Sequence, residues 1–344
     1  MQRLKVATEK QTSDNSPKNA MTVSVVLCTW NRSASLARAL SSIANSVFSA
    51  PLKWEVVVVD NNSNDRTRDV VSAFRAEYGD KLRYVFESRP GLSNARNAGI
   101  REAQGEILAF VDDDVTVEPA WLDNLTSPLR SGEWAGSGGR ILPAHNFAPP
   151  RWFSFENKLL VPLCAYYNAG DVLSEATEPP YGANMAFRRA MFGKHGGFRT
   201  DLGRTLTNLL SNEDTEFGRR LIAVGERLCY VPSATVYHEI HESRLHKGYY
   251  LRWWFDYGRA VSREKGKGEP VWGISRNYVR IPKMILTVLP SAAFRWLATF
   301  NRKERFLWKC AVWRIAGQIV ESYRVAVEPH PTDDRVPQAN SREA

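Results

Sequence analysis

The chain has 344 residues and a formal net charge of +9 at pH 7, with 43% hydrophobic and 24% charged residues. This balance is ordinary for a globular protein, and the length suits one large domain with an appended region. The four cysteines lie far apart and form no CxxC pair, which argues against a disulfide framework or a structural zinc site and favours a reducing, cytoplasmic compartment.

The two ends of the chain are polar. Residues 1–20 lack the apolar segment of a signal peptide, and we expect a disordered tail there and a flexible tail at 328–344. No stretch of about 18 uninterrupted apolar residues exists, because Pro290 and Arg295 interrupt the longest candidate, 284–300. The sequence therefore predicts no membrane-spanning helix.

Short apolar runs alternate with helical patterns through the first third of the chain. The predicted strands lie at 23–28, 54–59, 82–87 and 107–111. The predicted helices begin after Ser33, as N-cap, and lie at 66–77 and 94–104. This alternation predicts an α/β fold with a Rossmann-like, mostly parallel sheet and flanking helices.

Beyond this alternation the pattern divides the rest of the chain. The catalytic domain is expected to span 21–243, with a long loop over one end of the sheet at 143–180 and a helix at 212–224. A helical region in which basic and aromatic residues interleave is expected at 244–327.

Polar side chains follow three of the predicted strands. Cys28, Asp60 and the triplet at 112–114 should converge on one crevice, because ligands bind outside the carboxyl ends of parallel strands. Three adjacent carboxylates repel one another, and hard oxygen ligands suit Mg²⁺ or Mn²⁺ shared with a diphosphate. The alternative is a solvated acidic turn. Asp60 could accept a hydrogen bond from a nucleobase or a ribose hydroxyl, or it could stabilise a turn.

Three further segments carry candidate chemistry. Arg96 lies in a segment of small residues at 91–99, and its planar guanidinium could donate hydrogen bonds to a base or a phosphate. Alternatively, the segment could be an ordinary helix start. Glu213 and Asp214 begin a helix and could take a proton from an acceptor hydroxyl, or Ser211 and Asp214 could form a capping box. His238 could bind a metal or the diphosphate, or could be structural.

Taken together, these segments resemble the family 2 glycosyltransferases of GT-A fold, over about residues 22–245. Seven segments occur in the order of that family: 23–32 (VSVVLCTWNR), 56–63 (VVVVDNNS), 91–99 (GLSNARNAG), 110–114 (FVDDD), 182–188 (GANMAFR), 196–198 (GGF) and 213–217 (EDTEF). Each segment alone is a weak signal, but seven in order outweigh the structural alternatives. The family often has Pro where Cys28 stands and Tyr where Trp30 stands.

The resemblance implies a role for each matching residue. Cys28, Thr29, Trp30, Asp60, Arg96, Asp112 and Asp113 would bind the nucleotide-sugar; Asp114, Asp112 and His238 would bind the divalent cation, Mn²⁺ or Mg²⁺; Asp214, with Glu213 beside it, would be the catalytic base; and Gly182, Ala183 and Asn184 would lie near the transferred sugar and the acceptor. The implied reaction moves a sugar, with inversion, from a nucleotide-diphosphate donor, expected to be UDP-linked, to a saccharide or lipid-linked saccharide acceptor.

Other classes of protein fit less well. A nucleotidyltransferase of related fold would have a glycine-rich loop after the first strand, and a dinucleotide-binding oxidoreductase would have GxGxxG there, whereas the chain has Thr29-Trp30-Asn31-Arg32. A basic adaptor for membrane or nucleic acid would leave the acidic triplet and Asp214 unexplained, and no nucleic-acid partner is expected.

The basic and aromatic C-terminal region suggests two alternatives. Apolar residues such as Trp296, Phe300 and Phe306 mix with Arg302 and Lys309, so the region could bind an anionic membrane as a peripheral surface. It could equally be a helical subdomain packed on the catalytic core.

Overall fold

A computed structural model describes residues 23–157, 159–205, 207–266 and 276–327. The predicted tails at 1–20 and 328–344 lie outside the described residues. Within the described ranges, no helix is both long enough and apolar enough to cross a membrane.

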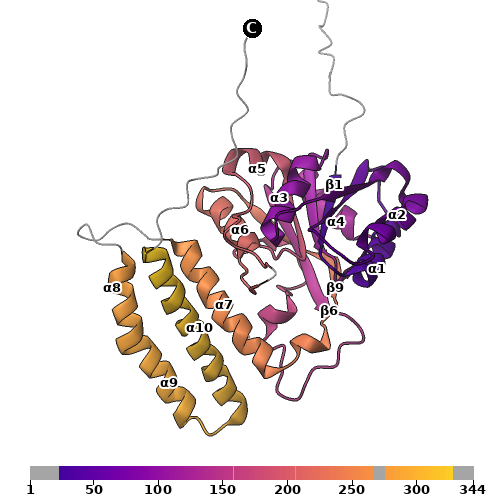
Figure 1. Cartoon of the computed structure of the whole chain (residues 1–344). Coiled ribbons are helices and arrows are strands. Elements are labelled where there is room, and N and C mark those ends of the chain that lie inside the picture. Colours follow the sequence, from indigo (N-terminus) through magenta and orange to yellow (C-terminus); the bar gives the residue numbers. More distant parts are fainter. Residues whose placement is uncertain (1–22, 158, 206, 267–275, 328–344) are drawn as a thin grey trace, which may run out of the picture.

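Four parallel strands form one half of the central sheet, as the sequence predicts (Figure 1). They are β1 (Val23–Thr29), β2 (Trp54–Asp60), β3 (Leu82–Phe86) and β4 (Ile107–Asp112), in the order β3-β2-β1-β4. Every residue of β1 and β2 is buried, because helices cover both faces of the sheet. In the register of the sheet, Cys28 lies between Val59 and Asp112, so the ends of β1 and β4 are neighbours.

The other half of the sheet is mixed. It contains β5 (Val115–Val117), β6 (Gly136–Pro143), β7 (Ser174–Glu175), β8 (Asn184–Arg188) and β9 (Leu228–His238). The order continues β4-β8-β6-β9-β5, with β8 antiparallel to both of its neighbours and β7 paired to β9. The prediction of a mostly parallel sheet with flanking helices is confirmed.

Helices cover the two faces of the sheet in separate groups. One apolar cluster joins the sheet to α1 (Ser33–Ala44), α2 (Thr67–Tyr78) and α4 (Trp121–Arg130), and another joins it to α3 (Leu92–Glu102), α5 (Arg189–His195) and α6 (Glu213–Ala223). Ser33 is not the N-cap of α1 as predicted, because the helix begins at this residue. Its backbone N–H donates to Asp65 Oδ2 at 2.9 Å, so a distant loop supplies the cap.

The predicted helical region contains α7 (Lys247–Lys265), α8 (Arg276–Lys283), a π-helical turn (Met284–Val288), α9 (Leu289–Ala298) and α10 (Arg302–Val327). In Figure 1, α10 lies between α7 and the α8–α9 pair. A third apolar cluster joins α7 and α10 to the loop after β6 through Phe153, Tyr250 and Phe306. Part of the region that could have faced a membrane is therefore packed on the rest of the chain.

Two glycines bring the backbones of α7 and α10 together. A Cβ atom at Gly258 would overlap the carbonyl oxygen of Arg314, and one at Gly317 would overlap that of Phe255. Only glycine allows this approach, which fixes the position of α10 along α7.

All four cysteines are buried and unpaired, as expected for a chain without disulfides. Burial raises the pKa of Cys164 to about 11 and that of Cys28, Cys229 and Cys310 to about 12. The thiols therefore stay protonated at neutral pH.

We expect Gly258→Ala to lower the free energy of unfolding by about 1–3 kcal/mol, because the new methyl group must push α10 away. Gly248→Ala is the matched control on the same helix, since no atom lies within 4 Å of the added methyl group. The measurement is urea denaturation followed by circular dichroism. Equal stability of the two variants would contradict the tight contact.

Candidate active site

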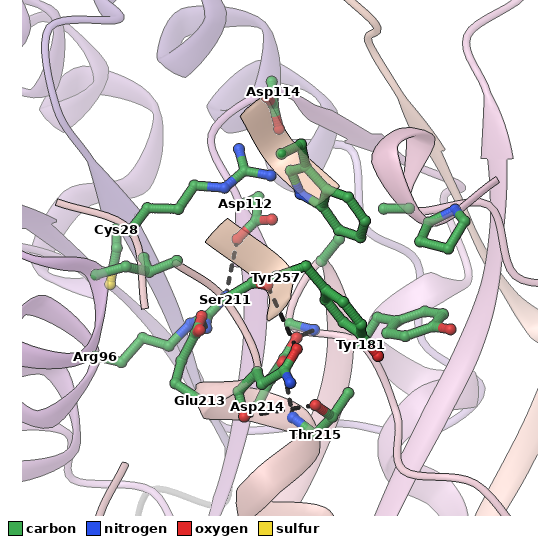
Figure 2. Close-up of a pocket in the computed structure, with 18 of the residues that line it drawn as sticks. Cys28, Arg96, Asp112, Asp114, Tyr181, Ser211, Glu213, Asp214, Thr215 and Tyr257 are labelled. Atoms are coloured by element: carbon green, nitrogen blue, oxygen red, sulfur yellow. Dashed lines mark hydrogen bonds and ion pairs between the residues drawn. The ribbon is translucent and has the colours of Figure 1, made fainter. Parts of the chain in front are cut away.

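A cavity of about 580 Å³ lies at the carboxyl ends of β1 and β4, as expected for a sheet of this kind (Figure 2). Its walls come from the ends of β1, β4 and β9, the starts of α3 and α6, the segment 159–183, the loop before α6, and helices α7 and α10. Most of the residues predicted to act together line this one cavity: Cys28, Thr29, Trp30, Arg96, Asp112, Asp113, Asp114, Gly182, Ala183, Glu213, Asp214 and His238.

Arg96 joins two of the predicted acidic groups. Its guanidinium donates from Nη2 to Asp112 Oδ1 at 3.1 Å and from Nη1 to Glu213 Oε1 at 2.5 Å. The arginine is 2% exposed, packs over the ring of Phe198, and lies so close to Gly182 that a Cβ atom there would overlap it. A buried charge needs such partners, so Arg96 holds β4 and α6 at a fixed separation.

The start of α6 presents two adjacent carboxyl groups with different surroundings. Burial, reinforced by the negative charge of Asp214, raises the pKa of Glu213 to about 7, and its Oε2 atom has no hydrogen-bond partner in the described structure. Asp214 instead accepts from the backbone N–H of Gly182 at 2.6 Å and from that of Thr215 at 2.7 Å. The alternative of a capping box with Ser211 is wrong, because the N-cap is Asn212, at φ 80°, and no side chain caps the helix.

The three carboxylates of the acidic triplet point to different partners. Asp112 is the most accessible, with a side chain that is 33% exposed. Asp113 accepts from Thr29 Oγ1 at 2.7 Å and from Arg32 Nη1 at 2.9 Å, and burial raises its pKa to about 6. The alternative of a solvated acidic turn is wrong, because Asp113 and Asp114 are both buried.

Asp114 lies among three basic side chains. Its Oδ2 faces Arg32 at 2.8 Å and Arg244 at 3.2 Å, while its Oδ1 lies 3.3 Å from His238 Nε2. Burial alone would raise the pKa of Asp114, but His238, Arg244 and Arg32 hold it well below the usual range. Asp114 is therefore ionised at neutral pH.

The fit to a divalent cation is good for two of the three predicted ligands. Asp114 Oδ1 and His238 Nε2 face each other, and both atom types bind Mn²⁺. Asp112 is held by Arg96, and in the described ranges no three His, Cys, Asp or Glu side chains converge to hold a metal by themselves. The remaining ligands would have to come from the diphosphate, which is how such ions are commonly bound.

Two predicted site residues do not line the cavity. Asp60 accepts from Tyr84 Oη at 2.7 Å and from the backbone N–H of Ser63 at 2.9 Å, while its neighbour Asn61 lines the cavity instead. Asn184 accepts from Trp121 Nε1 at 2.8 Å and donates to the carbonyl oxygens of residues 140 and 234. In the described structure both side chains bind protein groups and neither lines the cavity, so their roles as ligand contacts stay predictions.

Sequence reasoning missed the far wall of the cavity. Trp253, Trp254 and Tyr257 of α7 and Arg314 of α10 line it, so the cavity crosses the boundary predicted near residue 243. The interleaved aromatic and basic residues of both helices were the available signal, but they also fit a membrane surface. Arg32, Arg204, Arg244 and Tyr181 were missed as well.

Comparison with known proteins identifies the class. The sequence profile of Glycosyl transferase family 2 matches residues 24–196, and the chain belongs to this family. The match also decides against the nucleotidyltransferase, oxidoreductase and adaptor alternatives.

Particular relatives agree with this class. The chain is 28% identical over 249 residues to a glucosyl-dolichyl phosphate glucuronosyltransferase from Haloferax volcanii, covering 70% of this chain and 77% of the relative. It is 27% identical over 269 residues to the succinoglycan biosynthesis protein ExoM from Rhizobium meliloti, covering 75% and 81%. A mannosyltransferase from Pyrobaculum calidifontis, solved in complex with GDP-Man and Mn²⁺, has a similar fold, with a TM-score of 0.59, 20% identity and coverage of 90% and 89%.

The raised pKa of Glu213 predicts a pH-dependent stability. Because the folded protein binds this proton more tightly than the unfolded chain, the free energy of unfolding falls as pH rises from about 4.5 to 7. In the Glu213→Gln variant, the decrease in the free energy of unfolding between pH 4.5 and 7 should be smaller by about 1–3 kcal/mol. Urea denaturation from pH 4.5 to 8 measures it. Parallel pH profiles for the two proteins would show that Glu213 is ionised throughout.

Proposed function

We propose that this glycosyltransferase moves a sugar from a nucleotide-diphosphate donor, UDP-linked in the first instance, to a hydroxyl of a saccharide or lipid-linked saccharide, with inversion. The observation that carries the proposal is the joining of Asp112 and Glu213 by the buried Arg96 within one cavity. This contact supports the proposal because it brings the acidic triplet, the proposed donor side, close to Asp214 on the proposed acceptor side.

Asp214 is the proposed catalytic base. The backbone N–H groups of Gly182 and Thr215 fix the orientation of its carboxylate, and the side chain lines the cavity. The acceptor hydroxyl would give its proton to Asp214 while its oxygen bonds to the anomeric carbon and the bond to the diphosphate breaks. A single displacement of this kind inverts the anomeric configuration.

Basic side chains would stabilise the leaving diphosphate. Arg204 forms no ion pair within the described ranges, yet it lies close enough to Glu213 and Arg244 to influence their pKa values. Its guanidinium would bind phosphate oxygens that appear as the donor breaks down. A divalent cation held by Asp114 and His238 would add positive charge at the same oxygens.

The relatives suggest where the reaction belongs. The names of the Haloferax and Rhizobium proteins refer to a dolichyl phosphate-linked sugar and to the assembly of a polysaccharide. We extend this to the present chain as a role in polysaccharide or glycoconjugate biosynthesis, with a hexose as the transferred group.

Asp214→Asn should reduce transfer at least about 100-fold, because the amide cannot take the acceptor proton, while donor binding stays intact. Thermal shift with UDP-sugars and GDP-sugars, with and without Mn²⁺, identifies the donor and reports its binding. Release of nucleotide then reports turnover. Near-normal turnover in Asp214→Asn would remove the base assignment, and a lack of stabilisation by any nucleotide-sugar would remove the proposal.

We also propose that the surface that runs from the π-helical turn (Met284–Val288) through α9 to the start of α10 contacts an anionic membrane at the cytoplasmic face. Leu286, Phe294, Leu297 and Phe300 are all more than 60% exposed, and basic residues accompany them at Arg295, Arg302, Lys303 and Arg305. Apolar side chains next to exposed positive charge match the chemistry of an anionic lipid surface.

The native protein should float with vesicles that contain phosphatidylglycerol at low salt, and the triple variant Phe294→Ser, Leu297→Ser, Phe300→Ser should not. The double variant Val172→Ser, Leu173→Ser is the control, because it removes exposed apolar residues from a loop outside these helices. If the triple variant and the control float equally, the membrane proposal is wrong.

A further inference from the structure

The wall of the cavity that α7 and α10 provide contains an aromatic cluster of three rings, Trp253, Trp254 and Tyr257, each in contact with the other two. Tyr257 stacks on Trp253, with ring centroids 5.1 Å apart and an interplanar angle of 17°. Trp253 in turn meets Trp254 edge-on at 5.0 Å. All three residues line the cavity, although α7 begins after the segments that match the family.

One member of the aromatic cluster, Tyr257, lies near the proposed base. Figure 2 shows Tyr257 and Tyr181 beside Asp214. Tyr181 directly precedes Gly182, whose N–H binds the Asp214 carboxylate. Burial raises the pKa of Tyr181 to about 12, and the charges of Asp214 and Tyr257 contribute to the rise, as expected for groups that are close together.

A second member of the aromatic cluster, Trp254, lies near Arg314. Its guanidinium carbon is 5.8 Å from the centre of the Trp254 ring. Within the described ranges Arg314 forms no ion pair, and its Nε atom is buried without a hydrogen-bond partner. Arg32, Arg96 and Arg244 in the same cavity all pair with carboxylates, so Arg314 differs from them.

The two indole N–H groups of the aromatic cluster also lack hydrogen-bond acceptors within the described ranges. Nε1 of Trp253 and Nε1 of Trp254 are buried, and neither has a hydrogen-bond partner in the described structure. An unpaired buried donor is costly, so each such group calls for an acceptor, which an ordered water or a bound ligand can supply. The tight contact at Gly258 keeps the turn of α10 that carries Arg314 against α7.

We propose that this aromatic cluster and Arg314 form the acceptor subsite, and that the subsite takes a saccharide that carries an anionic group, a phosphate or a carboxylate, away from the attacking hydroxyl. The inference rests on the proposed function and adds the class of acceptor. The hydroxyl lies at Asp214, the sugar rings lie along the aromatic side chains, and the anionic group pairs with the fork of Arg314.

The test uses protein saturated with UDP and Mn²⁺, so that the donor part of the cavity is filled. Three probes are titrated by calorimetry: methyl α-D-glucoside, α-D-glucose 1-phosphate and D-glucuronic acid. We expect at least one anionic probe to bind about tenfold more tightly than the glucoside, as one charge-assisted hydrogen bond provides, and the stronger of the two identifies the anion.

Arg314→Gln should abolish the preference for the anionic probe, while Arg314→Lys should keep part of it. Arg324→Gln is the matched control, because it removes an exposed positive charge from the same helix, outside the cavity, and should keep the preference. Thermal melting of each variant reports its folding.

The outcomes separate this inference from the proposed function. If neither UDP nor GDP binds the native protein in the presence of Mn²⁺, the proposed function falls. If UDP binds but the three probes respond equally, or if the preference survives in Arg314→Gln, the anionic acceptor subsite is overturned and the proposed function stands.

Discussion

The site depends on one buried guanidinium. Arg96 lies at the start of α3 and binds Asp112 at the end of β4 and Glu213 at the start of α6, which are separated by about a hundred residues of chain. Loss of Arg96 would leave Glu213 buried without its counterion, a change that typically costs several kcal/mol. The same contact sets the distance between the acidic triplet and the carboxylate beside Glu213.

Much of the core could be predicted from the sequence because its signals are local. Continuous apolar runs mark β1 and β2, and a strand end followed by Asp112 marks the crevice. The sequence was less informative where the interacting residue is distant in the chain. Asp65 caps α1 from another loop. Tyr84 donates a hydrogen bond to Asp60, and Trp121 donates one to Asn184. Residue type predicted the polar groups well, but only tertiary packing decides which of them remain free for a ligand.

The far wall of the cavity, formed by α7 and α10, could not be predicted from the sequence for a related reason. The residues of α7 that line it belong to a helix whose pattern of aromatic and basic residues fits a packed helix and a membrane surface equally. Their position depends on α10, which approaches closely only because Gly258 and Gly317 lack side chains. The two walls thus differ in origin. The core supplies the charged groups, and the C-terminal helices supply the aromatic surface, so either wall can change in evolution with little effect on the other.

The buried thiols have a practical consequence. Cys164, Cys229 and Cys310 lie in packed clusters, and Cys28, at the cavity, is 9% exposed and protonated at neutral pH. Maleimide reagents attack thiolates at accessible positions, so the native cysteines should be nearly inert toward them. A fluorophore or spin label could therefore be attached at one new surface cysteine without first removing the others. Such a label on α9 or α10 would report whether these helices move relative to the sheet when ligands bind.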